Sequence, residues 1–285
     1  MAQKKNVDAR DKRGHDNREF FDQLYPTGDS MTLTLETRDL TIRFGGHVAV
    51  NKVSCTFCPG ELTAIVGPNG AGKTTYFNLI SGQLQPTGGG VLLDGEDITR
   101  LTAPLRTRKG LGRAFQLTNL FPNLSVEENV RLAVQAASGV HYEMLRPWMK
   151  RRDLIERADA ILDSIALGNR RAVAAAALSH GDQRKLEVAL MMALEPKVFM
   201  FDEPTAGMSV DEVPVVLDLI ARLKNDTSKI ILLVEHKMDV VRSLADRIIV
   251  LHNGQLVADG KPAEVIASPI VQEAYLGIAP GKTAA

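Results

Sequence analysis

A glycine-rich loop between a short apolar run and a helical segment constrains the fold of this chain more than any other feature. Residues 62–66 form an uncharged run that is typical of a strand buried on both faces. The loop that follows matches GxxxxGK[ST], not the GxGxxG of dinucleotide sites, and reads Gly67-Pro68-Asn69-Gly70-Ala71-Gly72-Lys73-Thr74. Its glycines let successive backbone N–H groups turn toward phosphate oxygens, and a helix that begins near Gly72 adds its positive end. The loop therefore predicts a site for nucleotide phosphates.

Acidic residues and a histidine follow two later apolar runs. The run 198–201 ends in Asp202 and Glu203, and the run 230–234 is followed by Glu235 and His236. Ligands of parallel sheets bind at the carboxyl ends of the strands, so these side chains are expected beside the phosphate loop. We expect Lys73 to reach the β- and γ-phosphates, and Thr74 and Asp202 to ligate Mg²⁺. Glu203 points away from Asp202 and would polarise the attacking water, while His236 would contact the γ-phosphate.

Composition excludes several classes of protein. The 34 basic and 34 acidic residues cancel, which argues against general nucleic-acid binding. The hydrophobic fraction of 45% is ordinary for a globular core, and no run approaches the ~20 apolar residues of a membrane span. Any work at a membrane is therefore expected from outside the bilayer. Cys55 and Cys58 have CxxC spacing, but they lie on a predicted strand without a second ligand pair, so we interpret them as reduced, structural thiols.

The chain is expected to divide into a charged N-terminal tail over 1–30 and one domain over 31–285. The tail carries six basic and six acidic residues without a secretory signal pattern, and Met31 is an alternative start. Period-two alternation over 33–36 and 40–44 predicts half-buried strands, and 85–90 reads as a turn. Buried runs that alternate with helical segments predict an α/β fold with a largely parallel sheet. The block 101–180 reads as an inserted helical subdomain, with one helix capped at Ser125 and another over 155–165 that ends at Gly168.

A second anion site is predicted at the start of another helix. This helix runs to about Leu194 and opens on Leu178-Ser179-His180-Gly181-Asp182-Gln183-Arg184. Ser179 can cap the helix and Asp182 lies in its first turn, which would suit an ordinary capped helix. The alternative is that free N–H groups, the Ser179 hydroxyl and the open space at Gly181 receive an anion.

Together these elements resemble the ATP-binding subunits of ABC transporters over about residues 33–277. The resemblance rests on the loop 67–74, the signature 178–184, the Asp202-Glu203 pair and His236, in this order. It implies a P-loop NTPase core with N-terminal antiparallel strands, an inserted helical subdomain and a C-terminal part over about 251–285. It also implies that Phe44 stacks on adenine and that Gln116 senses metal and water. The nucleotide contacts it implies are Phe44, Gly67, Pro68, Asn69, Gly70, Ala71, Gly72, Lys73, Thr74, Thr75, Ser179, His180, Gly181 and Asp182, with Thr74, Gln116 and Asp202 at the metal.

The chain departs from the family pattern at three positions. His180 replaces a glycine and Asp182 replaces a glutamine in the signature, and Ser209 stands where the interface loop often has an aspartate. Ser179 and Gly181 are kept, so contact with the γ-phosphate is still expected. The departures concern the tuning of dimer closure.

The resemblance implies how such a subunit works. Two ATPase subunits pack head to tail around two ATP, and the signature of one completes the site of the other. Closure would drive two transmembrane permease subunits, with a solute-binding protein selecting the cargo, from the cytoplasmic face of a bacterial plasma membrane. An apolar stretch around Phe121 either packs the helical subdomain or forms a groove for a permease helix.

The subfamily is expected to be the branched-chain amino acid importers. The phrase Arg43-Phe44-Gly45-Gly46, the loop Ala206-Gly207-Met208 and the tail Ala274-Tyr275-Leu276-Gly277 resemble that group. Urea or amide importers and lipopolysaccharide-export ATPases are the alternatives. A soluble ABC ATPase acting on ribosomes or DNA is the alternative from another class. An inactive regulatory subunit is disfavoured because Lys73, Asp202, Glu203 and His236 are present.

Overall fold

The computed structural model describes residues 33–114, 120–138 and 152–276. The predicted tail over 1–30, Gln116 and Gly277 lie outside these residues, so the structure does not test the predictions made for them. No helix in the described part of the chain is long and apolar enough to cross a bilayer.

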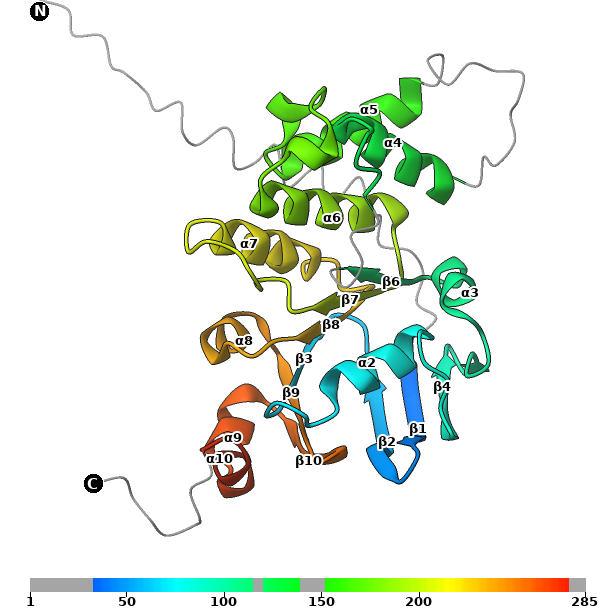
Figure 1. The fold of residues 1–285 in the computed structure, drawn as a ribbon, viewed down its shortest axis with the longest axis vertical. Coiled ribbons are helices and arrows are strands. Elements are labelled where there is room, and N and C mark those ends of the chain that lie inside the picture. The colour runs from blue at the N-terminus through cyan, green and yellow to red at the C-terminus, as the bar shows by residue number, and fades with distance from the viewer. Residues whose placement is uncertain (1–32, 115–119, 139–151, 277–285) are drawn as a thin grey trace, which may run out of the picture.

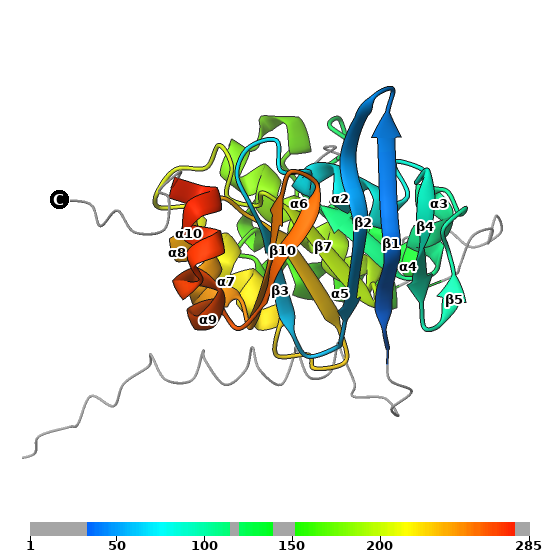
Figure 2. The ribbon, with the colours of Figure 1, turned by 90° about the horizontal axis from the view of Figure 1, so that it is seen from below.

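Two sheets form the framework of the molecule. One is antiparallel with the strand order β2-β1-β4-β5, and the other is mostly parallel with the order β10-β9-β3-β8-β7-β6. Figure 2 shows β1, β2, β4 and β5 side by side, away from the helices α8, α9 and α10. The strands are β1 Leu35–Phe44, β2 His47–Phe57, β3 Leu62–Val66, β4 Gly88–Leu93, β5 Glu96–Asp97, β6 Leu111–Ala114, β7 Val198–Asp202, β8 Ile230–Val234, β9 Arg247–His252 and β10 Gln255–Gly260.

The helices lie around the parallel sheet, and α4, α5 and α6 gather at one end of the molecule (Figure 1). Their apolar faces share one buried cluster, which includes Val130, Leu162 and Val188. The predicted α/β architecture with N-terminal antiparallel strands and inserted helices is therefore confirmed. The helices are α2 Lys73–Ser81, α3 Ala103–Arg108, α4 Val126–Ala137, α5 Arg152–Ser164, α6 His180–Leu194, α7 Val213–Leu223, α8 Met238–Leu244, α9 Pro262–Ala267 and α10 Pro269–Leu276, with short 3₁₀ turns at Gly168–Arg170 and Ala175–Ala177.

The central strands are buried on both faces, as their uncharged runs predicted. Phe199 and Phe201 of β7 pack into the helical cluster, whereas Val198 and Met200 pack into a second cluster between the two sheets. This alternation follows from the period of two along a strand. Tyr76 and Phe77 of α2 lie in the second cluster, so α2 is held between the sheets and fixes the loop before it.

Arg106 holds the far end of α2. Its guanidinium is fully buried and donates to the carbonyl oxygens of Leu79 at 2.7 Å, Ile80 at 2.6 Å, Thr99 at 2.7 Å and Leu101 at 3.1 Å. The last carbonyls of a helix have no partner within it, so Arg106 replaces the missing donors. Burial lowers the pKa of Arg106 to about 10, and the side chain stays charged at neutral pH.

Two local predictions were wrong, and a third was only partly right. Residues 85–90 are not all turn, because β4 begins at Gly88 and pairs with β1. Gly89 has φ +75°, and a Cβ there would overlap the carbonyl oxygens of Arg38 and Asp39, so the glycines allow a close strand approach. The two strands predicted over 33–36 and 40–44 form a single strand, β1, which begins at Leu35 and is bulged between the two predicted segments. The helix expected to end at Gly168 ends at Ser164, and Ala166 takes the left-handed φ of 58°.

The two cysteines differ in burial. Cys55 is buried on β2, Cys58 is exposed just after it, and both thiols are free. The described residues contain no cluster of three His, Cys, Asp or Glu side chains that could hold a metal.

Candidate functional site

The phosphate loop has the backbone that its glycines predicted. Gly67, Gly70 and Gly72 all have positive φ, and Gly72 is the N-cap of α2 with φ 97°. A Cβ at Gly72 would lie 2.4 Å from the carbonyl oxygen of Ala49. The loop therefore passes too close to β2 for any side chain at this position.

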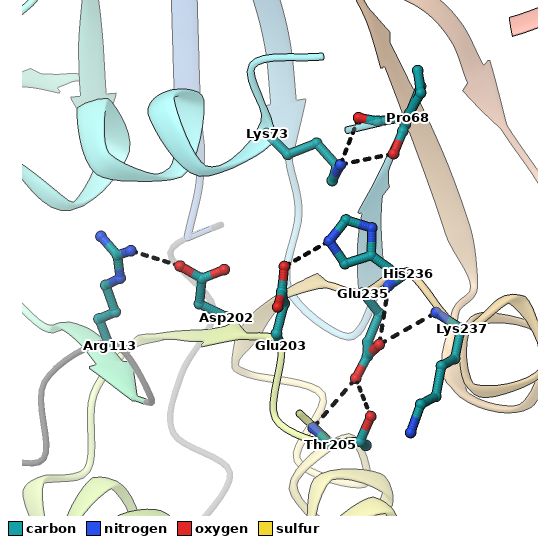
Figure 3. A network of polar contacts seen from close by, with 10 residues as sticks. Pro68, Lys73, Arg113, Asp202, Glu203, Thr205, Glu235, His236 and Lys237 are labelled. Carbon is teal, nitrogen blue, oxygen red and sulfur yellow. Dashed lines mark hydrogen bonds and ion pairs between the residues drawn. The ribbon is translucent and has the colours of Figure 1, made fainter. Parts of the chain in front are cut away.

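Lys73 folds back over the loop. Its Nζ donates to the carbonyl oxygens of Gly67 at 2.7 Å and Pro68 at 2.9 Å (Figure 3). Burial lowers the pKa of Lys73, while the carboxylates of Glu203 and Asp202 act in the opposite direction. The ammonium thus lies on the side of the loop that faces the two acidic residues.

A cleft of about 490 Å³ gathers most of the predicted site. Glu203 and His236 face the phosphate loop across it, and Phe44 stands at its edge with half of its surface exposed. His47 and Ala49 of β2 also line it, and sequence reasoning missed both. Both could have been predicted from the Gly45-Gly46 turn, because a tight turn after Phe44 brings the start of β2 beside that residue. The cleft is lined by Phe44, His47, Ala49, Asn69, Gly70, Ala71, Gly72, Lys73, Thr74, Thr75, Glu203 and His236.

Glu203 and His236 form a direct pair. Glu203 Oε1 lies 2.6 Å from His236 Nε2, and both side chains are partly exposed to the cleft (Figure 3). Glu203 follows β7 with φ 50°, a left-handed conformation that is uncommon outside glycine. Its backbone N–H donates to the Val234 carbonyl oxygen at 2.9 Å, which ties the ends of β7 and β8 together. The pair brings a carboxylate and an imidazole together at the mouth of the phosphate loop.

Glu235 lies beneath this pair and was missed as a site residue. Its carboxylate is buried, and Oε1 accepts from the Thr205 hydroxyl at 2.7 Å and from the Thr205 N–H at 3.3 Å. Oε2 accepts from the backbone N–H groups of His236 at 3.0 Å and Lys237 at 3.4 Å. Glu235 therefore joins the loop after Glu203 to the loop that carries His236 (Figure 3). Its place beside His236 at a strand end was the available signal.

Asp202 is paired with Arg113, a second residue that sequence reasoning missed. Arg113 Nη2 donates to Asp202 Oδ2 at 2.7 Å, and Nη1 donates to Asn78 Oδ1 at 2.6 Å and to Ser81 Oγ at 2.8 Å. Burial raises the pKa of Asp202, and Arg113 opposes the shift. A lone arginine in the buried strand β6 was the signal, since a buried charge needs a partner.

The two predicted Mg²⁺ ligands lie in different surroundings, because Thr74 lines the cleft, whereas Asp202 is buried outside its lining and is paired with Arg113. Thr74 follows Lys73 in α2, and Asp202 ends the strand beside the phosphate loop. Mg²⁺ takes one or two protein oxygens and fills its remaining positions with water and phosphate.

The signature residues lie away from the cleft. Ser179 caps α6 and accepts from the Asp182 N–H at 3.1 Å, and none of residues 179–182 lines the cleft. Asp182 Oδ1 accepts from Lys185 Nζ at 2.8 Å. The open side of Gly181 is not empty, because a Cβ there would overlap the carboxylate of Glu212. An anion that approached Gly181 from this side would meet the Glu212 carboxylate.

Comparison with known proteins gives the family. The model of the ABC transporter family matches residues 50–206, and the model "Branched-chain amino acid ATP-binding cassette transporter" matches residues 255–279. The chain is 39% identical to the high-affinity branched-chain amino acid transport ATP-binding protein LivG of Escherichia coli K12, over 85% of this chain and 97% of that protein. It is 38% identical to BraF of Pseudomonas aeruginosa, with the same coverage.

Solved structures agree with the sequence matches. An ATP-binding cassette of an ABC transporter in its ADP conformation has a TM-score of 0.73 and 28% identity, over 87% of this chain and all of that one. The cbiO1 protein of Clostridium perfringens, described as part of the ABC transporter complex cbiONQ, has a TM-score of 0.69 and 27% identity, over 85% and 95% of the two chains. The chain therefore belongs to the ABC transporter family, as one of its ATP-hydrolysing, ATP-binding subunits.

Proposed function

We propose that this chain powers a bacterial importer of branched-chain amino acids by hydrolysing ATP at the cytoplasmic face of the membrane. The proposed cargo is supported by the 39% identity to LivG, which extends over 97% of LivG, and by the match of residues 255–279 to the branched-chain family model. Urea import and lipopolysaccharide export have no comparable support among these matches.

In the proposed reaction, ATP binds in the cleft with its adenine against Phe44. Lys73 leaves the carbonyl oxygens of Gly67 and Pro68 and turns to the β- and γ-phosphates, which offer its ammonium a stronger, charged partner. Thr74 and Asp202 would hold Mg²⁺, which would neutralise charge on the phosphates. Gln116 is proposed to sense metal and water.

Glu203 is proposed to orient and polarise the attacking water. Its 2.6 Å contact with His236 Nε2 supports this role, because the imidazole fixes the carboxylate at the mouth of the phosphate loop. His236 then contacts the γ-phosphate as the water approaches. The positive φ of Glu203 is consistent with a functional constraint, since strained backbone clusters at active sites.

A second ATPase subunit is proposed to complete the site. Ser179 and Gly181 lie away from the cleft of their own chain, which supports their use on the ATP of a partner. Glu212 would have to move from the open side of Gly181, because its carboxylate and an approaching γ-phosphate repel each other. His180, Asp182 and Ser209 lie in the same region and would tune closure.

The assignment of Glu203 is tested by Glu203→Gln. Glutamine keeps the shape and a contact to His236 but is a poor base, so the variant should bind ATP normally and hydrolyse it about 10²- to 10⁴-fold more slowly. Nucleotide binding by fluorescence and phosphate release measure the two properties. Lys73→Ala is the control, because it should weaken binding itself. Near-normal turnover in Glu203→Gln would refute the assignment.

The cargo is tested separately. The subunit is purified with the permease subunits and the solute-binding protein that act with it, and the complex is placed in vesicles loaded with ATP. Uptake of radiolabelled leucine, isoleucine and valine is compared with uptake of urea. Stimulation of transport by urea and not by leucine would reject the proposed cargo while leaving the ATPase assignment intact.

A further inference from the structure

The phosphate loop contacts a tight turn that lies far from it in the sequence. This turn, Asn253-Gly254, connects β9 to β10, and β9 pairs in parallel with β3 up to Val66, the last residue before the loop. The Gly254 N–H donates to the carbonyl oxygen of Ala71 in the loop at 3.0 Å. The Gly254 carbonyl oxygen accepts from the Asn51 N–H of β2 at 2.8 Å. Gly254 therefore joins the phosphate loop to strands of both sheets.

Gly254 leaves no room for a side chain at this junction. Its φ of 74° is left-handed, and a Cβ would lie 2.7 Å from the carbonyl oxygen of Ala49 and 3.3 Å from the Cα of Val50. The loop residue Gly72 packs into the same place, because a Cβ on it would lie 3.4 Å from the Cα of Gly254. All of these neighbours are backbone atoms, so a side chain at Gly254 would have to displace either β2 or the turn itself.

The contact with Gly254 also fixes the direction of an N–H group in the loop. The carbonyl oxygen of Ala71 and the N–H of Gly72 belong to one peptide group, and the described residues include no cis peptide bond. In a trans peptide the C=O and the N–H point in opposite directions. Because the Ala71 oxygen points toward the turn, the Gly72 N–H points away from it. Ala71 and Gly72 both line the nucleotide cleft, so this peptide group lies at the cleft wall.

We propose that Gly254 is a positioning residue of the nucleotide site, which aims the Gly72 N–H at the phosphates of the bound nucleotide. The inference rests on the proposed function, which places those phosphates at the loop. Donors that are oriented in advance bind an anion without the cost of reorganising the backbone. The turn between β9 and β10 supplies this orientation from outside the loop, through main-chain contacts alone.

The test compares Gly254→Ala with a matched variant in another turn. The Asp94-Gly95 turn between β4 and β5 has nearly the same conformation, with φ of 53° and 77° against 49° and 74°, and a Cβ at Gly95 meets nothing within 4 Å. Gly95→Ala therefore imposes a similar backbone strain without the close contact. In Gly254→Ala we expect the dissociation constant for ADP with Mg²⁺ and the KM for ATP to rise about tenfold, with kcat within about threefold. Gly95→Ala should leave all three within about twofold.

Isotope labelling follows the loop directly. The sequence contains two Ala-Gly pairs, 71–72 and 206–207, so ¹³C in the alanine carbonyls and ¹⁵N in the glycines select two amide signals. ADP should shift the Gly72 signal in the unchanged chain and shift it less in Gly254→Ala. A Gly72 signal that does not respond to ADP in the unchanged chain would contradict both the proposed function and this inference. An equal shift at equal affinity in Gly254→Ala would overturn this inference and leave the proposed function intact.

A measurement on the unchanged chain gives a result even if Gly254→Ala does not fold. Phosphates that fix the Gly72 N–H also fix the Ala71 carbonyl oxygen, because the two belong to one peptide group. Hydrogen exchange of the Gly254 N–H should therefore slow when ADP and Mg²⁺ bind, and it should slow more than exchange of the Gly95 N–H. Equal slowing at Gly254 and Gly95, or none at either, would overturn the proposal.

Discussion

At the scale of residues, the pair of Glu203 and His236 depends on Glu235, whose carboxylate does not itself line the cleft. The sequence predicted Glu203 and His236 separately, because each follows a buried strand of one sheet. It could not predict that they lie 2.6 Å apart, since that distance depends on the path of two loops. Glu235 fixes this path by accepting from Thr205 in one loop and from the His236 N–H in the other. The position of Glu235 at a strand end was visible in the sequence, but its hydrogen bonds to two loops were not, because they exist only in the folded chain.

Glu235→Ala should therefore slow hydrolysis without weakening ATP binding. Loss of the carboxylate frees Thr205 and the His236 N–H, so Glu203 and His236 lose their alignment. Small misplacements of reacting groups reduce rates by up to about 100-fold, so we expect kcat to fall about 10- to 100-fold. KM for ATP should change little, because the phosphate loop is untouched. Steady-state phosphate release over a range of ATP concentrations measures both constants.

Lys237→Ala is the matched control for this experiment. Lys237 is the next residue after His236, and only its backbone N–H contacts Glu235, so alanine keeps the hydrogen bond. Thr205→Val removes the hydroxyl and should give an intermediate loss of kcat. A rise in KM with an unchanged kcat in Glu235→Ala would show that Glu235 supports nucleotide binding instead.

At the scale of elements, helix α2 is fixed at both ends. Gly72 begins it against the backbone of β2, and Arg106 bonds to the carbonyl oxygens of Leu79 and Ile80 at its end. The fixed start of α2 could be predicted from the sequence, because glycine followed by Lys-Thr is a local pattern. The contact at the end of α2 could not be predicted, because Arg106 belongs to α3 and is one of several basic residues between 100 and 113. Contacts between elements of this kind appear only when the chain is folded.

Arg106→Met should destabilise the protein strongly. Methionine can fill much of the buried volume, but it leaves the carbonyl oxygens of Leu79, Ile80 and Thr99 without their donor. Removing a buried charged partner of this kind costs about 3–5 kcal/mol in the free energy of unfolding. Urea denaturation followed by circular dichroism measures the change. Arg108→Met, at an exposed position of the same helix, should shift the free energy by no more than about 0.5 kcal/mol.

At the scale of the whole molecule, the nucleotide cleft and a second, apolar cavity of about 620 Å³ share no lining residue, and α2 contributes to both of them. The nucleotide cleft lies on β1, β2, the start of α2 and the ends of β7 and β8, whereas this apolar groove lies on the end of α2 and on α3, β6, α4 and α6. Arg113 connects them, because it lines the groove and bonds to Asp202 at the end of β7. The sequence predicted the motifs of each region, but their separation required the fold. In the proposed function, the first region hydrolyses ATP, and the groove is a separate surface on the helical side of the molecule.

A charge at Phe121 should separate transport from ATP hydrolysis. One of the two predictions for Phe121 places it in a groove for a permease helix, where the carboxylate of Phe121→Asp would face the apolar side of that helix and its burial would be unfavourable. Uptake by the complete transporter should fall at least about tenfold, whereas ATP hydrolysis by the isolated subunit should stay within about twofold, because Phe121 does not line the cleft. Ile270→Asp is the matched control, since Ile270 is a similarly exposed apolar residue on α10, outside the groove. Normal uptake in a stably folded Phe121→Asp variant would mean that the subunit is coupled to the permease through another surface. Equal losses of uptake and of ATP hydrolysis would mean that the two cavities do not act independently.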